Sequence, residues 1–253
     1  MRSLVLIALF SIPAVFCGGA ASENGLYGPV SVSDYLTGRF DPAAHPLFVD
    51  LASLKIPSDG RKHYLRKEAA TALHDLIAAF RKDHPKTEFF VRSSTRTFWD
   101  QKKIWEEKYN GATLVGGRDL SKSVRDPRAR ALEILRYSSM PGTSRHHWGT
   151  DVDINDLANR YFDRGDGKIL YDWLRVNATR FGFCMPYTAG RKHGYREERW
   201  HWSYAPLSRQ FTRQWLELSG KKIIISSKGV FAGSETCGDL APQYVSSVSE
   251  SCR

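Results

Sequence analysis

Two histidines and two aspartates are crowded into the stretch SRHHWGTDVDI, residues 144–154. His146 precedes Gly149 and Asp153 follows it. Glycine allows a sharp turn, so a ligand before the turn and one on the strand after it can converge on one point. On that strand Asp151 and Asp153 share a face because side chains alternate with a period of two. The spacing therefore favours a divalent metal site over a solvated turn, provided that another ligand meets it.

The stretch EERWHWSY, residues 197–204, offers that ligand. Alternation places Trp200 and Trp202 on one face, which we expect to be core rather than a sugar-binding platform. His201 lies on the other face, where it is free to point into a cleft, and Glu198 shortly precedes it. Zinc lowers the pKa of bound water to about 7, and a carboxylate within hydrogen-bond reach can remove its proton. The two stretches together predict a catalytic metal site.

These stretches resemble the motifs of the D-alanyl-D-alanine metallopeptidases, the vancomycin-resistance-type D,D-carboxypeptidases and dipeptidases. SRHHWGTDVD fits the family's S-x-H-x-x-G-x-x-x-D pattern, and ERWH fits its E-x-W-H pattern. A third stretch, SSTRTFWDQ, is similar to the family's Y-R-S-x-x-x-Q segment. The resemblance runs in the family's order from about Tyr64 to Tyr204. It places the chain in a superfamily that includes lysostaphin-type peptidases and the hedgehog signalling domain.

The resemblance implies a role for each matched residue and Zn2+ as the cofactor. The implied zinc ligands are His146, Asp153 and His201. Glu198 would be the general base, and Arg96 would polarise the scissile carbonyl or stabilise the oxyanion. Ser144 and Gln101 would help to bind the substrate. Two histidines and one aspartate leave a fourth tetrahedral position open, as in catalytic rather than structural zinc sites. The implied substrate is a peptidoglycan stem peptide that ends in D-Ala-D-Ala.

Two positions depart from the family pattern. Asp151 stands where the family often has a small residue, and it either orients a ligand histidine or lies on the surface of the strand. Thr95 replaces the tyrosine of the upstream segment, which leaves substrate contacts there open. His147 is expected to point away from the metal. Three residues of the loop before Glu198 could line the cleft, but we favour solvent exposure for them, namely for His193, Tyr195 and Arg196.

The leading hypothesis is a zinc-dependent D-alanyl-D-alanine carboxypeptidase that trims peptidoglycan stem peptides. The same zinc site would serve an endopeptidase if the cleft were not closed at one end to grip a free carboxylate. A catalytically inactive, zinc-stabilised binding module is a further alternative, although it would need neither Glu198 nor Arg96. A metal nuclease is disfavoured because the sequence shows no basic and aromatic groove. Nucleic acid is therefore not an expected partner.

The elements that must position these residues are predicted from hydrophobic periodicity and helix end signals. A helix is expected over residues 64–82, ended by Pro85, and another from Asp126-Pro127 to about Tyr137. The other expected elements are helices over 98–111, 169–181 and 207–218, strands over 88–94, 150–154, 199–204 and 221–227, a loop over 112–124 and a turn over 165–167. This mixture lacks a regular βαβ rhythm. We predict an α+β single domain with a central, mainly antiparallel sheet flanked by helices, and the zinc site in a cleft over the sheet.

Residues 1–21 are expected to be a signal peptide, with Arg2 before an apolar run and small residues at a cleavage site near Ala21. Residues 22–253 would then form the zinc D,D-peptidase domain with a short cysteine-containing C-terminal tail. This predicts export to the periplasm or cell envelope, with no transmembrane segment. A lipoprotein anchored through Cys17 is disfavoured because Phe16 fits a lipobox poorly.

Cleavage would leave three cysteines, Cys184, Cys237 and Cys252. Export favours a disulfide, and three cysteines allow one intramolecular pair. Cys237 with Cys252 closes the shortest loop, but Cys184 could reach either of them. The sequence leaves the pairing open.

The chain is basic, with a formal net charge of +10 that becomes about +9 when Arg2 is removed. A basic exported protein suits an anionic partner such as cell-wall polymer. The length of 253 residues and the hydrophobic content of 42% are sufficient for one sizeable core. A monomer is expected because nothing indicates a coiled coil or a swapped strand.

Overall fold

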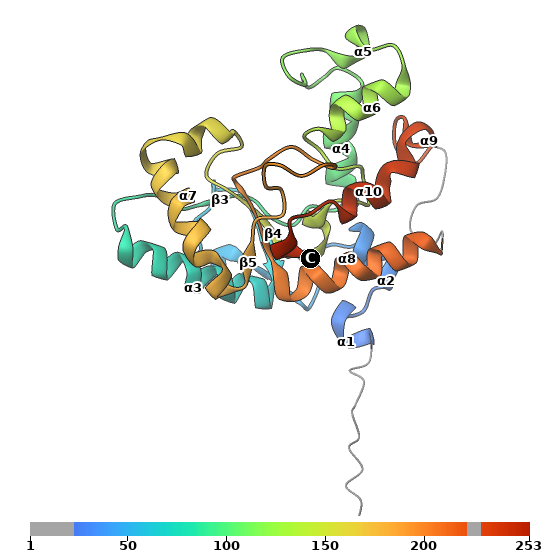
Figure 1. The fold of residues 1–253 in the computed structure, drawn as a ribbon. Helices are drawn as coiled ribbons and strands as arrows, with labels where there is room; N and C mark the ends of the chain where they lie inside the picture. Colours follow the sequence, from blue (N-terminus) through green and yellow to red (C-terminus); the bar gives the residue numbers. More distant parts are fainter. Residues whose placement is uncertain (1–22, 222–228) are drawn as a thin grey trace, which may run out of the picture.

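The structure, a computed structural model, describes residues 23–221 and 229–253 (Figure 1). The expected signal peptide, residues 1–21, and residues 222–227 of the last expected strand lie outside these ranges. Within them, no helix combines the length and the hydropathy that a bilayer span requires.

Among the described residues, the central sheet has four strands, and every neighbouring pair is antiparallel. In spatial order the strands are β3 (Val91–Ser93), β4 (Asp151–Ile154), β6 (His201–Tyr204) and β5 (Phe183–Cys184). Asp153 of β4 lies directly opposite His201 of β6. A second sheet pairs β1 (Phe48–Asp50) with β2 (Tyr64–Arg66). The predicted α+β fold with a mainly antiparallel central sheet is confirmed.

Alternation along β4 and β6 divides the sheet into an apolar and a polar face. Val152, Ile154 and Trp202 belong to a buried cluster that also contains apolar residues of α3 (Lys67–Asp83) and α7 (Gly165–Asn177). These two helices therefore cover the apolar face, as Figure 1 shows. The opposite face carries the alternate, polar residues of the same strands, as β-strand geometry requires.

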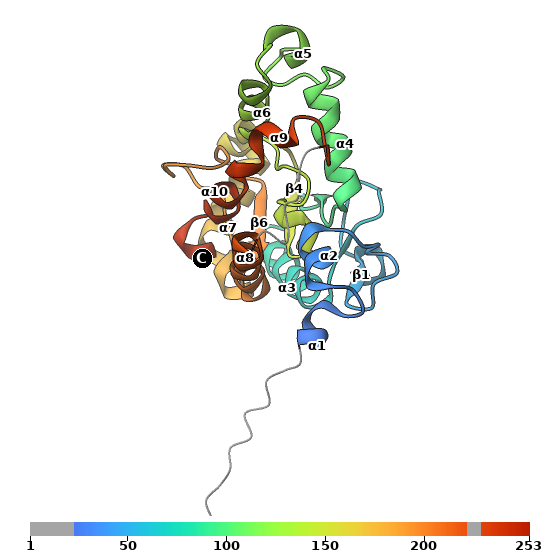
Figure 2. The ribbon, with the colours of Figure 1, turned by 90° about the vertical axis from the view of Figure 1, so that its right-hand side faces the viewer.

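A second group of helices packs around η2 and against one another (Figure 2). α8 packs against α2 and η2, α4 packs against α6, and α6 packs against α9. The α-helices not yet bounded are α1 (Glu23–Tyr27), α2 (Val32–Thr37), α4 (Phe98–Tyr109), α5 (Leu120–Ser123), α6 (Pro127–Leu135), α8 (Ala205–Gly220), α9 (Ser234–Cys237) and α10 (Ala241–Ser246). The 3-10 turns are η1 (Leu51–Leu54), η2 (Arg145–Trp148), η3 (Asn159–Asp163), η4 (Ala178–Phe181), η5 (Gly238–Leu240) and η6 (Glu250–Cys252).

Three local predictions were wrong. Residues 64–66 form β2 rather than the first turn of a helix, because β1 supplies a pairing partner from outside the periodic stretch. Gly165–Gly167 is the first turn of α7, not a separate turn. Gly167 packs so closely on Tyr161 that a Cβ added at Gly167 would lie 2.1 Å from the Tyr161 carbonyl oxygen. The expected loop over 112–124 contains α5, whose first turn is capped by the Asp119 side chain.

Candidate active site

A tight turn brings the first motif into position. The Ser144 hydroxyl accepts a hydrogen bond from the His146 backbone N–H at 3.3 Å and so caps η2. Gly149 ends η2 with a φ of +71°. Residues other than glycine adopt this backbone conformation only at a cost in conformational energy. A Cβ at Gly149 would lie 2.3 Å from Cε1 of Phe48. The chain then enters β4, so that His146 and Asp153 face each other across the turn.

His146, Asp153 and His201 offer ligand atoms that all lie within 4.8 Å of one another. Nε2 of His146 is 3.3 Å from Oδ2 of Asp153, and Nδ1 of His201 is 3.2 Å from Oδ1 of Asp153. All three side chains are buried. Although burial opposes its charged form, His146 and His201 hold the pKa of Asp153 well below its ordinary value.

The second nitrogen of each histidine is already engaged. Nδ1 of His146 lies 2.7 Å from the Ser94 carbonyl oxygen, and Nε2 of His201 lies 2.9 Å from Oδ1 of Asp151. Among the described residues, neither Nε2 of His146 nor Oδ1 of Asp153 has a hydrogen-bond partner, although both atoms are buried. Buried polar atoms are normally satisfied. These buried atoms without a hydrogen bond, together with histidines fixed through their other nitrogen, fit a bound metal ion.

Asp151 orients His201 and is not a surface residue, which decides between the two predicted alternatives. It is fully buried, and its charge is balanced by the Arg145 guanidinium, whose Nε lies 3.1 Å from Oδ1 of Asp151. Ser203 and Thr150 donate to the other carboxylate oxygen at 3.0 and 2.6 Å. Although burial alone would raise it, Arg145 and His201 hold the pKa of Asp151 below its ordinary value.

Glu198 lies beside the three candidate ligands, in the connection between β5 and β6. Its Oε2 is 3.2 Å from Nδ1 of His201, and its backbone N–H donates to the Tyr187 carbonyl at 2.9 Å. Burial raises the pKa of the Glu198 carboxyl above its ordinary value. A carboxylate with a raised pKa next to a metal site is suited to accept and return a proton.

Arg96 reaches the same point from the end of β3. Its Nη2 lies 3.9 Å from Oδ2 of Asp153, and both residues line a hollow of about 540 Å3 that also borders Ser94 and Thr95. The side chain is 25% exposed, so it can meet a ligand in this hollow. Its backbone is held on both sides, because Arg96 N–H donates to the His146 carbonyl and the Arg96 carbonyl lies 2.7 Å from Nδ1 of His147. His147 therefore points away from the candidate ligands, as expected.

Ser144 and Gln101 are both buried. The Ser144 hydroxyl is engaged in the cap of η2. Nε2 of Gln101 donates to the Ser139 carbonyl at 2.8 Å, and its buried Oε1 has no partner among the described residues. The part of each in binding substrate stays a prediction.

The arrangement can now be compared with known proteins. The model of the D-alanyl-D-alanine carboxypeptidase family (VanY) matches residues 62–207, more than half of the chain. The chain belongs to this family. The matched range contains every residue of the site just described.

Two curated relatives and one solved structure illustrate the similarity. The chain is 28% identical over 177 residues to the putative carboxypeptidase YodJ of Bacillus subtilis. The aligned region covers 67% of this chain and 56% of that protein. The chain is 31% identical over 176 residues to a D-alanyl-D-alanine carboxypeptidase of Enterococcus faecalis, covering 68% of this chain and 58% of the relative. A mutant of the vancomycin-resistance D,D-pentapeptidase VanY, solved with Zn(II), is 26% identical with a TM-score of 0.45, covering 63% and 83% of the two chains. The carboxypeptidase-family chain thus spans less than two thirds of the length of either curated relative.

Sequence reasoning about this D-alanyl-D-alanine carboxypeptidase homologue missed two residues of the site. Arg145 lies inside the first motif, yet nothing in its spacing distinguishes it from a surface arginine. Tyr187 belongs to none of the sequence motifs, and the centroid of its ring lies 4.7 Å from that of the His201 ring. The expectation that Tyr195 is solvent-exposed was wrong, because it is buried against Tyr187. Trp202 is a core residue and Trp200 packs against the same cluster, as predicted.

Proposed function

We propose that this protein is a zinc-dependent D-alanyl-D-alanine carboxypeptidase that removes the terminal D-alanine of peptidoglycan stem peptides. The observation that carries the proposal is the convergence of His146, Asp153 and His201 beside Glu198 and Arg96, with two buried ligand atoms that make no hydrogen bond among the described residues. Membership of the D-alanyl-D-alanine carboxypeptidase family supports the same reaction.

The donor set is chemically suited to catalytic zinc. Two imidazole nitrogens and one carboxylate oxygen are typical ligands of zinc, and three protein ligands leave a position open. Zinc held by these groups would supply Lewis acidity that lowers the pKa of water and polarises a peptide carbonyl. The proton of His146 would lie on Nδ1 toward Ser94, and that of His201 on Nε2 toward Asp151.

Glu198 would carry the proton through the reaction. Its carboxylate accepts the proton of the attacking water and then returns it to the nitrogen of the leaving D-alanine. Burial favours the protonated form between these two steps, which is the direction of the shift in the pKa of Glu198. Positioned proton transfer of this kind contributes about 10²- to 10⁴-fold to rates.

Arg96 would act on the oxygen of the reacting carbonyl. Its guanidinium is always charged and offers planar donors to an oxygen that gains negative charge. The backbone contacts with His146 and His147 fix the base of this side chain while its end faces the hollow. Ser144 and Gln101 would contribute to holding the stem peptide, and the expected export and basic charge fit an anionic murein substrate.

The test is to incubate zinc-loaded protein with purified pentapeptide muropeptides and with crosslinked dimers, and to identify products by mass spectrometry. We expect loss of one terminal alanine from the pentapeptide. The matched control, Glu198→Ala, should reduce this rate by about 10³-fold or more, because the proton acceptor is missing.

Other products would contradict the carboxypeptidase assignment. Cleavage inside the stem or across the dimer, with the pentapeptide end left intact, would identify an endopeptidase that uses the same site. No cleavage of either substrate by protein with a full equivalent of zinc would contradict the assignment as a hydrolase.

A further inference from the structure

The C-terminal residues 229–253 lie beyond the range matched by the family model. This segment, here called the tail, contains α9, η5, α10 and η6. Figure 2 shows α10 and the chain end beside α8. The tail also contacts the connection between β5 and β6, residues 185–200, which we call the base loop because it carries Glu198.

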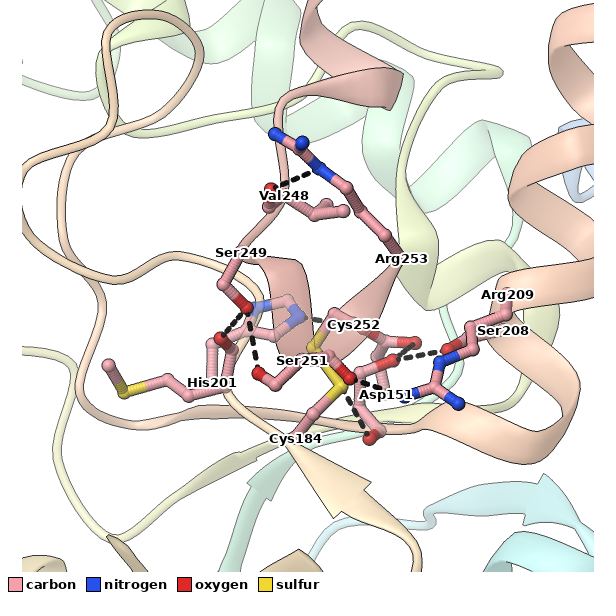
Figure 3. Close-up of a disulfide and its surroundings, with 12 residues drawn as sticks. Asp151, Cys184, His201, Ser208, Arg209, Val248, Ser249, Ser251, Cys252 and Arg253 are labelled. Atoms are coloured by element: carbon pink, nitrogen blue, oxygen red, sulfur yellow. Dashed lines mark hydrogen bonds and ion pairs between the residues drawn. A yellow bond between two sulfur atoms is a disulfide. The ribbon is translucent and has the colours of Figure 1, made fainter.

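The first contacts are at the start of the base loop. The Sγ atoms of Cys184, the last residue of β5, and Cys252 of the tail are joined as a disulfide (Figure 3). Next to it, the Ser249 hydroxyl donates to the Met185 carbonyl at 2.7 Å and the Ser249 backbone N–H donates to the Pro186 carbonyl at 2.8 Å. Three bonds thus fix three consecutive residues of the chain to the tail.

A second group of contacts lies further along the base loop. Nη1 of Arg191 donates to the Ser247 carbonyl at 2.7 Å. The ring of Tyr195 packs edge to face on that of Tyr244, with centroids 5.1 Å apart. Gly194 approaches so closely that a Cβ would lie 2.6 Å from Cβ of Ser247. The start and the middle of the base loop are therefore held by the same short tail.

These contacts continue inward to the candidate site. Tyr187 follows Pro186 directly, and its carbonyl accepts the backbone hydrogen bond of Glu198 at 2.9 Å. Its ring packs against Tyr195 at 5.0 Å and against His201 at 4.7 Å. The position of Glu198 thus depends on Tyr187, which in turn lies between the two groups of tail contacts.

We propose that the tail is a disulfide-locked clamp that positions Glu198, so that full activity requires the bond between Cys184 and Cys252. This inference rests on the proposed function, because it assigns Glu198 the proton transfer. The tail residues act through the base loop and are positioning residues. The candidate zinc ligands lie on η2, β4 and β6, and the tail contacts described above reach them only indirectly, through the ring of Tyr187 on His201, so the clamp should affect catalysis more than zinc binding.

Closing the clamp is a two-electron oxidation. The thiols of Cys184 and Cys252 together lose two protons and two electrons. A small disulfide such as oxidised glutathione accepts them and is released as two thiols. The bond spans 68 residues, so it strongly restricts the separation of tail and base loop. Oxidation on export would therefore complete the site in the compartment where disulfides persist.

The test compares Cys252→Ala and Ser249→Ala with a matched control, Cys237→Ala, which removes the other cysteine of the tail. Each full-length, zinc-loaded variant is assayed for kcat and KM of D-alanine release from pentapeptide, for zinc affinity by chelator competition, and for amide hydrogen exchange. For Cys252→Ala we expect kcat to fall at least tenfold while KM and zinc affinity change less than threefold. Exchange in residues 185–198 should quicken at least tenfold.

Ser249→Ala, which keeps the disulfide, should show the same pattern with a smaller effect, and Cys237→Ala should match the wild type within twofold. The clamp is overturned if kcat of Cys252→Ala stays within twofold of the wild type, or if faster exchange is confined to residues 229–253. If no form of the protein releases D-alanine, the proposed function fails, and exchange in residues 185–198 alone decides whether the tail clamps the base loop.

Discussion

The candidate zinc ligands are oriented by residues that would never touch a metal. Asp151 hydrogen-bonds to Nε2 of His201, and Arg145 balances the charge of Asp151. Both Asp151 and Arg145 are buried. Such partners set the tautomer and basicity of a ligand histidine, and their loss typically lowers metal affinity or activity about 10- to 100-fold. The sequence motifs contain both residues but assign a role to neither.

The first prediction concerns Asp151. Asp151→Asn keeps the shape of the side chain but removes the negative charge between Arg145 and His201. We expect zinc affinity to fall about 10- to 100-fold, measured by competition with a chromophoric chelator. Asp156→Asn, an exposed change just beyond β4, is the control and should leave the affinity unaltered. Equal affinities for Asp151→Asn and the wild type would show that Asp151 has no orienting role.

The second prediction concerns the pH dependence of a thiol. Burial raises the pKa of the Cys237 thiol to about 12. The thiolate is the reactive form, so at pH 8 only about one molecule in 10⁴ can react, and the rate should rise about tenfold per pH unit below this pKa. Mass spectrometry after iodoacetamide should show no adduct at Cys237 in the native protein and an adduct there in guanidinium chloride. Equally fast labelling of native and unfolded protein at pH 8 would contradict the burial of this thiol.

At the scale of elements, the strands that carry the site were the most predictable part of the fold. Strict alternation in TDVDI and RWHWSY separates Asp153 and His201 from Val152 and Trp202, and this periodicity survives in the antiparallel pair β4 and β6. The strand β2 was not predictable in the same way, because its partner β1 lies outside the periodic stretch. Local pattern predicts which face a residue occupies, but not which distant segment it pairs with.

The long-range contacts of the site follow the same rule. Any two of Cys184, Cys237 and Cys252 could have paired, and the choice of Cys184 with Cys252 depends on where the tail crosses β5. The burial of Tyr195 likewise depends on Tyr187 and Tyr244, which come from different segments. Neither contact leaves a signal in spacing or periodicity.

The third prediction tests the turn between η2 and β4. Gly149→Ala introduces a side chain at a positive φ and places its Cβ against Phe48, whereas Gly190→Ala has a similar φ of +76° and meets nothing within 4 Å. We expect the control to lower the free energy of unfolding by about 1 kcal/mol. Gly149→Ala should cost about 2–4 kcal/mol. Denaturant unfolding measures both, and equal losses would mean that close packing at Gly149 contributes nothing.

At the scale of the whole molecule, segments outside the family match brace the site from two sides. On the N-terminal side, the Tyr35 hydroxyl donates to the Trp148 carbonyl at 2.9 Å, and the Trp148 ring N–H donates to the Leu36 carbonyl at 3.1 Å. These bonds tie α2 to η2, which carries His146. On the C-terminal side the tail holds the base loop. The range matched by the family model contains the candidate site residues, and both flanking segments contact the elements that carry them.

The most direct test of the account is a zinc titration of the metal-stripped protein, followed by D-alanine release from a pentapeptide stem. We predict that activity returns in proportion to added zinc and reaches its maximum at about one equivalent per chain, as expected for one three-ligand site. Glu198→Ala should bind the same equivalent without releasing D-alanine. Full activity in the stripped protein, or one bound equivalent without D-alanine release by the wild type, would contradict the account.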